Sequence, residues 1–301
     1  MEQVQGAARA EASGADAVPA FPEPLVFGRR PRLLSRPGPL PQVRRPDTEI
    51  DGADLRGLVV RATSIRGDAH RYFGTPRQDA MGLWHDGDRT LLACVADGLG
   101  SKERSHVGAA TACEVAPDRL PGLSSPTELG TAARSFIENI AREINERAAR
   151  ESVTPDQLST TFLAAVVEES PDGSRHRAHI MRVGDCGAWH LYKGEWAPCF
   201  AEADGDEADG GEAVATSTTR ALPRDFEQVE VVTVDLYPGD MLLLSTDGLD
   251  RPMLLVPQVR KQLAEWWSRP DPPSLPEFFW QMSFQAKTYD DDRTAVCIWR
   301  V

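Results

Sequence analysis

The pattern of hydrophobic and polar residues along the chain predicts more strands than helices. Residues 89–96 form a nearly unbroken apolar run that ends at Asp97-Gly98, as expected for a buried strand followed by a turn. Lys193-Gly194 lies between two further runs and indicates a two-residue hairpin. The expected strands cover residues 58–60, 89–96, 161–168, 178–184, 187–192, 195–198, 229–234, 240–246 and 294–301.

Helical spacing of apolar residues marks fewer segments. From Leu129 to Ile144 the apolar positions follow one another at intervals of one, three or four residues, which predicts a long amphipathic helix. Ser125 would cap this helix, with Pro126 at its first position. We expect further helices at residues 106–116, 257–268 and 275–286. Because the helices fall in pairs between groups of strands, the pattern favours an α+β fold with mainly antiparallel sheets.

Residues 1–55 differ in composition from the rest of the chain. They are rich in Ala, Gly, Pro and Arg and show neither helical nor strand periodicity, so they would bury too little surface to offset their ordering entropy. We therefore expect a disordered or peripheral extension over residues 1–55 and one folded domain over residues 56–301. The extension contains a cluster of arginines, which we call the basic island. It is either part of a solvated tail or a docking arm for an acidic partner. The island consists of Arg29, Arg30, Arg32, Arg36, Arg44 and Arg45.

The charge balance is acidic, with 33 Lys and Arg against 46 Asp and Glu and a net charge of −13. This balance argues against a nucleic-acid partner, because Lys and Arg supply the affinity for phosphate backbones. Residues 202–212 hold six acids and no base, which predicts a charged loop. A further hypothesis is that the basic island folds back onto this loop.

The cysteines and the apolar runs bear on the cellular compartment. Five cysteines without a Cys-x-x-Cys motif exclude a disulfide framework and a cysteine zinc site, and they fit a reducing environment. No secretory signal is visible, and no apolar run approaches the ~20 residues that a membrane span needs. We therefore expect a cytoplasmic protein without membrane contact.

Several aspartates occupy the ends of predicted strands. Asp97, Asp185 and Asp247 each follow an apolar run and lie beside a glycine, which lets the backbone turn sharply and approach a ligand. Asp79 and the run at 290–292 lie in similar contexts. Carboxylates that converge must take up protons or bind cations, and hard oxygen ligands suit Mg²⁺ or Mn²⁺. Two such ions can clamp a phosphoryl group, so the residues indicate a binuclear metal site for phosphoester hydrolysis.

In these same segments the chain resembles a known family, the metal-dependent protein phosphatases of type 2C. The first segment, residues 67–80, is similar to a bacterial branch of the family, with Gly67, His70, Gly74 and Gln78-Asp79-Ala80. The resemblance covers residues 57–301. The other segments that carry it are residues 95–100, 159–161, 183–188, 238–240 running into 245–249, and 291–294.

The resemblance implies both an architecture and an activity. The fold would be a four-layer α-β-β-α sandwich of two mainly antiparallel sheets flanked by helix pairs. The activity would be the hydrolysis of phosphoserine and phosphothreonine in proteins by a metal-activated water, without a phosphoenzyme. The partners would be phosphorylated proteins and a cognate serine/threonine kinase. The cofactors would be two divalent cations, Mg²⁺ or Mn²⁺, with a third, weaker ion in some members.

The resemblance also implies roles for individual residues. Asp97 would bridge both metals, the carbonyl of Gly98 would bind one of them, and Asp247 and Asp291 would complete the shell of the first metal. Asp185 matches the acid that serves the additional metal, and Asp79 would act through a metal-bound water. Thr161 and Thr246 would be structural residues beside the site.

One departure from the family pattern concerns the phosphate clamp. Most members place an arginine five residues before the acid at position 79, where this chain has Gly74. The candidates for this task are Arg71, His70 and Arg77, because a guanidinium can bind phosphate through two hydrogen bonds and a protonated histidine through a weaker version. Gln78 stands where the family has Glu, which removes one negative charge beside the metals.

This departure leaves three functions open. The first is a phosphoprotein phosphatase. The second is a catalytically weak phospho-binding or scaffold protein of the same fold. The third is a metal-dependent nuclease or small-molecule phosphatase, although the net charge makes nucleic acid a poor partner. For an active phosphatase, the acidic loop at residues 201–212 predicts a preference for basic phosphosites.

Overall fold

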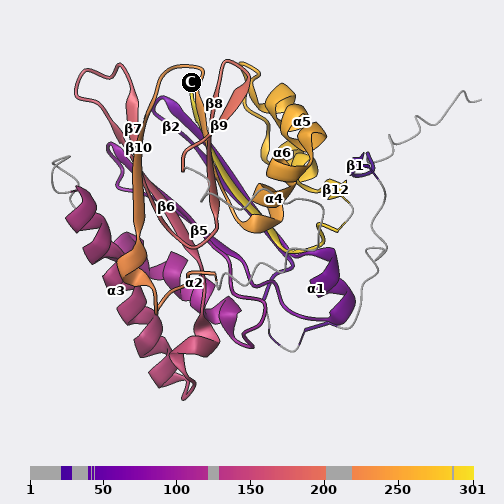
Figure 1. Ribbon diagram of the computed structural model, residues 1–301. Coiled ribbons are helices and arrows are strands. Elements are labelled where there is room, and N and C mark those ends of the chain that lie inside the picture. Colours follow the sequence, from indigo (N-terminus) through magenta and orange to yellow (C-terminus); the bar gives the residue numbers. More distant parts are fainter. Residues whose placement is uncertain are drawn as a thin grey trace, which may run out of the picture.

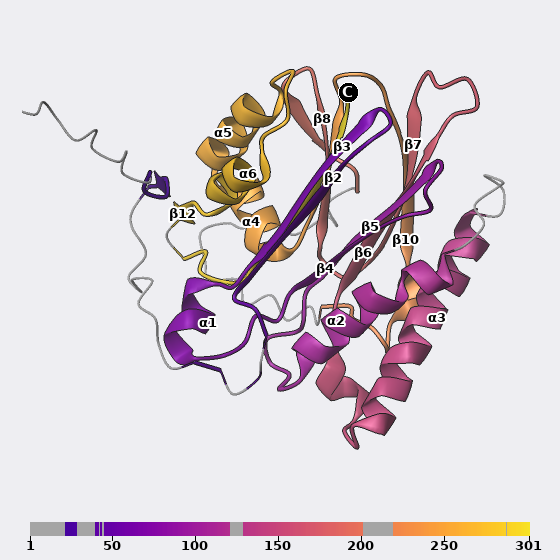
Figure 2. The same cartoon turned by 180° about the vertical axis from the view of Figure 1, so that it is seen from behind.

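The computed structural model describes residues 22–28, 40–41, 43, 45–120, 129–200, 219–286 and 288–301. Two large antiparallel sheets lie face to face at its centre, and helices cover the outer face of each sheet (Figures 1 and 2). This is the four-layer α-β-β-α sandwich that the sequence predicts.

The first sheet has five strands in the order β10-β7-β6-β5-β4. Neighbouring strands are antiparallel throughout. Asp97 directly follows β5, which lies between β6 and β4. The strands are β4 (Ala80–His85), β5 (Thr90–Ala96), β6 (Phe162–Glu169), β7 (His176–Val183) and β10 (Glu230–Leu236).

The second sheet has six strands in the order β2-β3-β13-β11-β8-β9, again antiparallel between neighbours. Its central strands β13 and β11 are buried along nearly their whole length. The strands are β2 (Thr48–Leu55), β3 (Leu58–Ile65), β8 (Gly187–Tyr192), β9 (Glu195–Pro198), β11 (Met241–Ser245) and β13 (Arg293–Arg300).

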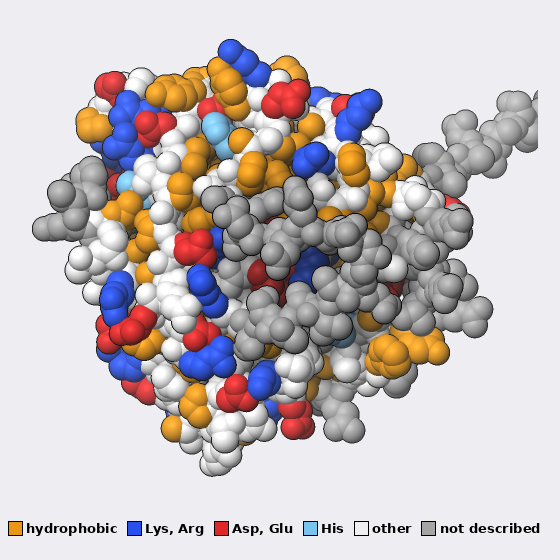
Figure 3. Space-filling view, in the orientation of Figure 1, with side chains coloured by type: hydrophobic (Ala, Val, Ile, Leu, Met, Phe, Trp, Pro, Cys, Tyr) orange, Lys and Arg blue, Asp and Glu red, His pale blue; other side chains and the backbone are white. Residues whose placement is uncertain are grey.

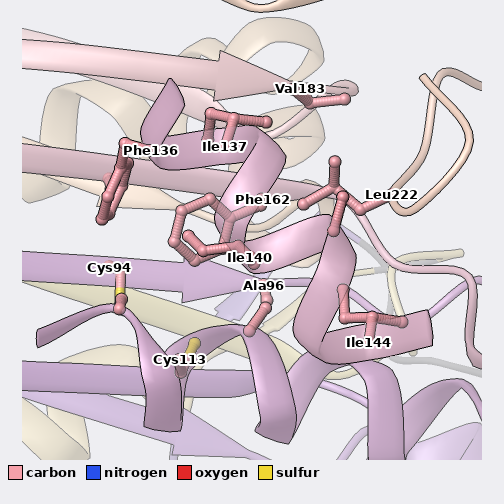
Figure 4. Close-up of a cluster of buried hydrophobic side chains, with 14 of the residues drawn as sticks. Cys94, Ala96, Cys113, Phe136, Ile137, Ile140, Ile144, Phe162, Val183 and Leu222 are labelled. Atoms are coloured by element: carbon pink, nitrogen blue, oxygen red, sulfur yellow. The ribbon is translucent and has the colours of Figure 1, made fainter. Parts of the chain in front are cut away.

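Two helices cover the five-stranded sheet. In α3 (Leu129–Arg150) the apolar stripe that the sequence shows is buried, from Ala133 to Ala148. Phe136 of this helix packs against Phe162 of β6, and α2 (Ser105–Val115) adds small side chains to the same core (Figure 4). Charged side chains of both signs cover the surface around α3 (Figure 3). Glu143 and Arg134 of this helix pair with Arg119 and Glu227 of neighbouring segments.

Three helices cover the six-stranded sheet on the opposite side of the molecule (Figure 2). They are α4 (Asp247–Leu255), α5 (Pro257–Trp267) and α6 (Leu275–Met282). The predicted helix at residues 275–286 is too long, because Gln285 and Ala286 form the short strand β12, which pairs in parallel with β1 (Val26–Phe27). Trp266 and Trp267 of α5 pack into this layer, and a separate apolar core fills the space between the two sheets.

The sequence missed several elements besides β1 and β12. β4, α1 (Asp68–Phe73) and α4 are short or carry residues that usually interrupt regular structure, such as Gly248 and Pro252 inside α4. β2 lies inside the segment that the sequence assigns to the disordered extension. It forms the edge of the sheet, and its eight residues are partly buried or exposed without a regular alternation, so the sequence shows no strand period there.

The expected boundary at residue 56 is therefore wrong for residues 48–55. All eight residues of β2 pair with β3 in the second sheet. Val26–Phe27 also has a partner, in β12, and Phe27 packs edge-on against Phe284. Arg45 is described and bonded, whereas the other five arginines of the basic island lie outside the described residues.

Candidate active site

The turn after β5 holds Asp97 in a fixed backbone position. The hydroxyl of Thr161 accepts a hydrogen bond of 3.1 Å from the amide of Asp97, and the amide of Thr161 donates one of 2.8 Å to its carbonyl. The hydroxyl of Thr160 donates to the same carbonyl at 2.8 Å. A Cβ at Gly98 would lie 2.8 Å from the backbone of Ser105, so only glycine lets this turn approach α2 so closely.

Asp79 lies where the two sheets meet, and it is buried with 1% of its surface exposed. Its Oδ2 atom accepts hydrogen bonds from the hydroxyls of Thr246 and Thr294, each 2.7 Å long. Asp79 directly precedes β4 of the first sheet, whereas Thr246 precedes α4 and Thr294 belongs to β13. The two hydrogen bonds therefore link the end of the first sheet to the second sheet. The placement of Thr161 and Thr246 beside the acids agrees with their expected structural roles.

Close backbone contacts bring the start of α4 to the acidic run before β13. A Cβ at Gly248 would lie only 1.8 Å from the carbonyl oxygen of Asp292. A Cβ at Gly67 would lie 2.3 Å from the carbonyl carbon of Asp291. The two glycines therefore allow Asp247 and Asp291 to share one end of the six-stranded sheet.

Asp292 organises this end of the site, a role that the sequence analysis missed. Its buried carboxylate accepts from the amide of Gly67 at 2.7 Å and from the amide of Gln78 at 2.5 Å. It also bonds the Nδ1 atom of His70 at 2.8 Å. The sequence alone could not show which of the three consecutive aspartates has this role, because the residues that bond Asp292 lie more than 200 positions away in the chain.

The carboxylates influence one another's ionisation. Burial raises the pKa of Asp97 well above its usual range, and the charges of Asp79, Asp247, Asp291 and Asp185 raise it further. Burial and then the charge of Asp291 raise the pKa of Asp247 to about 6, although Arg251 and a hydrogen bond to Asp97 oppose the rise. The pKa values of Asp79 and Asp291 are also raised, in both cases first by burial and then by the charge of Asp292.

Asp185 and Arg251 lie at the exposed edge of this cluster. Asp185 occupies the turn between β7 and β8, with 42% of its side chain exposed. The Nη2 atom of Arg251 lies 4.0 Å from its Oδ2, and the Nε atom lies 3.1 Å from Oδ2 of Asp247. The structure thus brings together all five predicted acids. Arg251, by contrast, had no signal in the sequence, because a basic residue inside a helix is ordinary.

The donor set suits hard divalent cations. Carboxylate oxygens are ligands of this kind, and burial and mutual repulsion, which raise the pKa values of Asp97 and Asp247, are relieved when a cation binds. Within the described residues, one group of three ligand atoms lies within 4.8 Å of one another, and it comprises His70, Asp291 and Asp292. Asp97, Asp185 and Asp247 are not members of that compact group.

The three candidates for the phosphate clamp have different surroundings. Arg77 is fully buried, lies 2.6 Å from Glu49 and donates to the carbonyls of Asp79 and Ser64, which argues for a structural role and against this candidate.

Arg71 and His70 lie nearer the surface but have acidic partners. The guanidinium of Arg71 bonds both carboxylate oxygens of Asp47, at 2.7 and 3.0 Å, and lies 3.3 Å from Asp68. Burial lowers the pKa of His70, but the hydrogen bond to Asp292 and the charges of Asp292 and Asp291 outweigh this and raise it.

The N-terminal segment reaches the site through Arg45. Its guanidinium donates to the carbonyl of Asp79 and to that of His106, both at 2.6 Å. Arg45 therefore links the backbone of a candidate site residue to α2. The acidic loop at residues 201–212, and with it the hypotheses on substrate preference and on folding back of the basic island, lies outside the described residues.

Comparisons with known proteins bear on the identity of the fold. A family model described as protein phosphatase 2C matches residues 66–280. PppA, a key regulatory component of T6SS in Pseudomonas aeruginosa, has a TM-score of 0.56 and 20% sequence identity, covering 83% of this chain and 100% of that chain. The serine/threonine phosphatase Stp1 from Staphylococcus aureus has a TM-score of 0.55 and 15% identity, covering 87% and 97%.

RsbX, solved in complex with magnesium, has a TM-score of 0.52 and 16% identity, covering 83% of this chain and 98% of that chain. A search of curated protein sequences finds no match. No helix among the described residues is both long and apolar enough to cross a membrane. At these identities the structural likeness establishes the shared fold. The family model extends over most of the chain, including Asp79, Asp97, Asp185 and Asp247, and the chain therefore belongs to the protein phosphatase 2C family.

Proposed function

We propose that this protein is a metal-dependent phosphoprotein phosphatase that hydrolyses phosphoserine and phosphothreonine. The observation that carries the proposal is the cluster of five carboxylates, in which the pKa of Asp97 is raised by burial and by its four acidic neighbours. Such a cluster is unfavourable by itself and becomes favourable with bound cations. The family membership supports the same activity, and the magnesium complex of RsbX supports a divalent ion.

Each acid has a role in this proposal. Asp97 would hold two divalent ions, Mg²⁺ or Mn²⁺, together with the carbonyl of Gly98, while Asp247 and Asp291 would complete the set around one of them. Asp185 would serve a third, weaker ion. When bound, such ions supply positive charge to phosphoryl oxygens and lower the pKa of a water molecule.

The remaining residues of the site position these groups. Thr246 and Thr294 occupy one oxygen of Asp79, which leaves its other oxygen to accept a hydrogen bond from the attacking water. Hydrolysis forms a bond between the water oxygen and phosphorus and breaks the bond to the seryl or threonyl oxygen. The products are inorganic phosphate and the free hydroxyl, so the substrates would be phosphoproteins made by a cognate kinase.

The test is a metal titration of phosphothreonine peptide hydrolysis, with wild-type protein beside Asp97→Ala. We expect turnover with Mn²⁺ or Mg²⁺, loss of turnover in excess EDTA, and at least about a hundredfold loss in the variant. Phosphopeptide binding without turnover would instead support a scaffold protein of this fold. Cleavage of DNA in preference to phosphopeptides would support a nuclease.

A further inference from the structure

A guanidinium beside the cations would add paired hydrogen bonds to a bound phosphate group, but the two arginines proposed from the sequence are already engaged. Arg77 has no exposed surface and would have to leave Glu49 to move. Arg71 forms a two-pronged pair with Asp47 and a further contact with Asp68. Turning Arg71 towards a substrate would break its hydrogen bonds to Asp47, and turning Arg77 would break its bonds to two backbone carbonyls and its ion pair with Glu49.

Arg251 meets the requirement better. It lies one helical turn after Asp247 on α4, and 60% of its side chain is exposed. Its guanidinium lies 3.1 Å from Asp247 and 4.0 Å from Asp185, at the exposed edge of the carboxylate cluster. Among the described residues, Arg251 and His70 are the basic side chains whose ion pairs reach Asp185, Asp247 or Asp291.

His70 is less suited to this task than Arg251. Its Nδ1 atom is bonded to the buried Asp292, and only 16% of its side chain is exposed. An imidazole so held offers one remaining nitrogen, whereas a guanidinium offers a planar pair of donors that matches two phosphate oxygens.

We propose that Arg251 is the residue that binds the phosphate group of the substrate. This inference rests on the proposed function, because it assigns a recognition group to the same site. Once cations neutralise Asp247 and Asp185, these acids no longer hold the guanidinium, and its exposed donors become available to an anion. The phosphate then lies on the side of the cluster that Asp185 and α4 form.

The alternative is that Arg251 only forms an ion pair with Asp247 and does not bind phosphate. An exposed pair between residues i and i+4 of a helix contributes little to stability, so a purely structural Arg251 could be removed with little effect. Lys261 and Glu265 of α5 form such a pair at 3.9 Å, with 79% of the lysine side chain exposed. Lys261→Ala is therefore a matched control that removes an exposed helical cation away from the carboxylates.

The experiment measures the affinity of the Mn²⁺-loaded protein for inorganic phosphate by calorimetry, and the KM and kcat for a phosphothreonine peptide. We expect Arg251→Ala to weaken phosphate binding and raise KM at least about tenfold each. Arg251→Lys should recover part of the loss, because it keeps the charge but not the paired donors. Lys261→Ala should stay within twofold of wild type.

The affinity for Mn²⁺ in the absence of phosphate is the companion measurement. We expect it to rise in Arg251→Ala, because the variant loses the cation beside Asp247. If phosphate affinity and KM stay within twofold of wild type while Mn²⁺ binds more tightly, Arg251 only compensates the charge of Asp247 and the proposal is overturned. Failure of the wild-type protein to bind millimolar phosphate with Mn²⁺ present would also overturn it. Phosphate binding that depends on Arg251, without peptide turnover, would uphold this assignment and refute the proposed activity.

Discussion

The Nε atom of Arg293 donates a hydrogen bond of 3.1 Å to the carbonyl oxygen of Gly248. In a regular helix this carbonyl would accept from the amide of residue 252, but Pro252 has no amide hydrogen. Arg293 also donates from Nη1 to the carbonyls of Met282 and Phe284, at 2.8 and 2.6 Å. It therefore supplies the missing helical bond and ties the turn that carries Asp247 to β13.

We predict that Arg293→Met destabilises the protein. The substitution keeps the apolar stem but leaves three buried carbonyls without their donor, and one unsatisfied buried group costs about 1–3 kcal/mol. Urea unfolding should show a loss of at least about 2 kcal/mol. The exposed Arg269 provides the control, since Arg269→Met should change the midpoint little. Equal midpoints for the two variants would contradict the role assigned to Arg293.

A second prediction concerns the contact between Gly248 and Asp292. In Gly248→Ala the new Cβ would lie 1.8 Å from the carbonyl oxygen of Asp292, and neither backbone can yield without moving the other. We expect a loss of about 1–3 kcal/mol in stability and a weaker affinity for Mn²⁺, because Asp247 and Asp291 would move apart.

Gly130→Ala is the matched control for this substitution. Gly130 lies in α3, and a Cβ there has no atom within 4 Å. Alanine also favours the helix, so this variant should be unchanged or stabilised by up to about 1 kcal/mol. Thermal unfolding and a Mn²⁺ titration of both variants check the pair. Wild-type metal affinity in Gly248→Ala would show that the close contact is not needed.

The raised pKa values predict an unusual pH dependence of stability. A carboxyl whose pKa is higher in the folded state stabilises the fold below its unfolded pKa and loses that contribution as the pH rises through the folded value. For Asp247 this interval runs from 3.8 to about 6 and corresponds to about 3 kcal/mol. The protein in EDTA should therefore become less stable between about pH 4 and pH 7, and Mn²⁺ should reverse the trend.

Asp247→Asn separates this effect from titration elsewhere. The variant lacks one of the titrating groups, so its stability in EDTA should fall less steeply over the same pH interval. Urea unfolding at several pH values measures the slope for both proteins. A slope in the variant equal to that of wild type would show that Asp247 does not carry the effect.

The N-terminal segment provides a prediction by truncation. A chain that begins at residue 45 keeps Arg45, Asp47, Glu49 and all of β2, whereas a chain that begins at residue 56 loses them. The shorter chain would expose the edge of β3 and leave the guanidinium of Arg77 buried without its acid. We expect it to be less stable than the longer chain by several kcal/mol, about 3 or more. Equal urea midpoints for the two chains would contradict this.

Much of the architecture could be predicted from local patterns. The apolar run before Asp97 and the stripe from Leu129 to Ile144 became β5 and α3 with small shifts at their ends. The strand-end aspartates were also found in advance, because an acid beside a glycine at the end of an apolar run is visible in the sequence. β2 escaped notice, because this edge strand has no buried residue and no regular alternation and depends on its pairing with β3.

The sequence by itself determined the acids and most of the longer elements, because burial periodicity and residue type are local properties. Only the tertiary structure decided how the charged groups are paired. Arg77 is buried against Glu49, Asp292 receives amides from the loop around Gly67, and Arg251 stands beside Asp185. The partners of a charge come from distant parts of the chain, and its burial depends on all the layers packed around it. The tertiary structure therefore decides whether an arginine has a structural role or can bind phosphate.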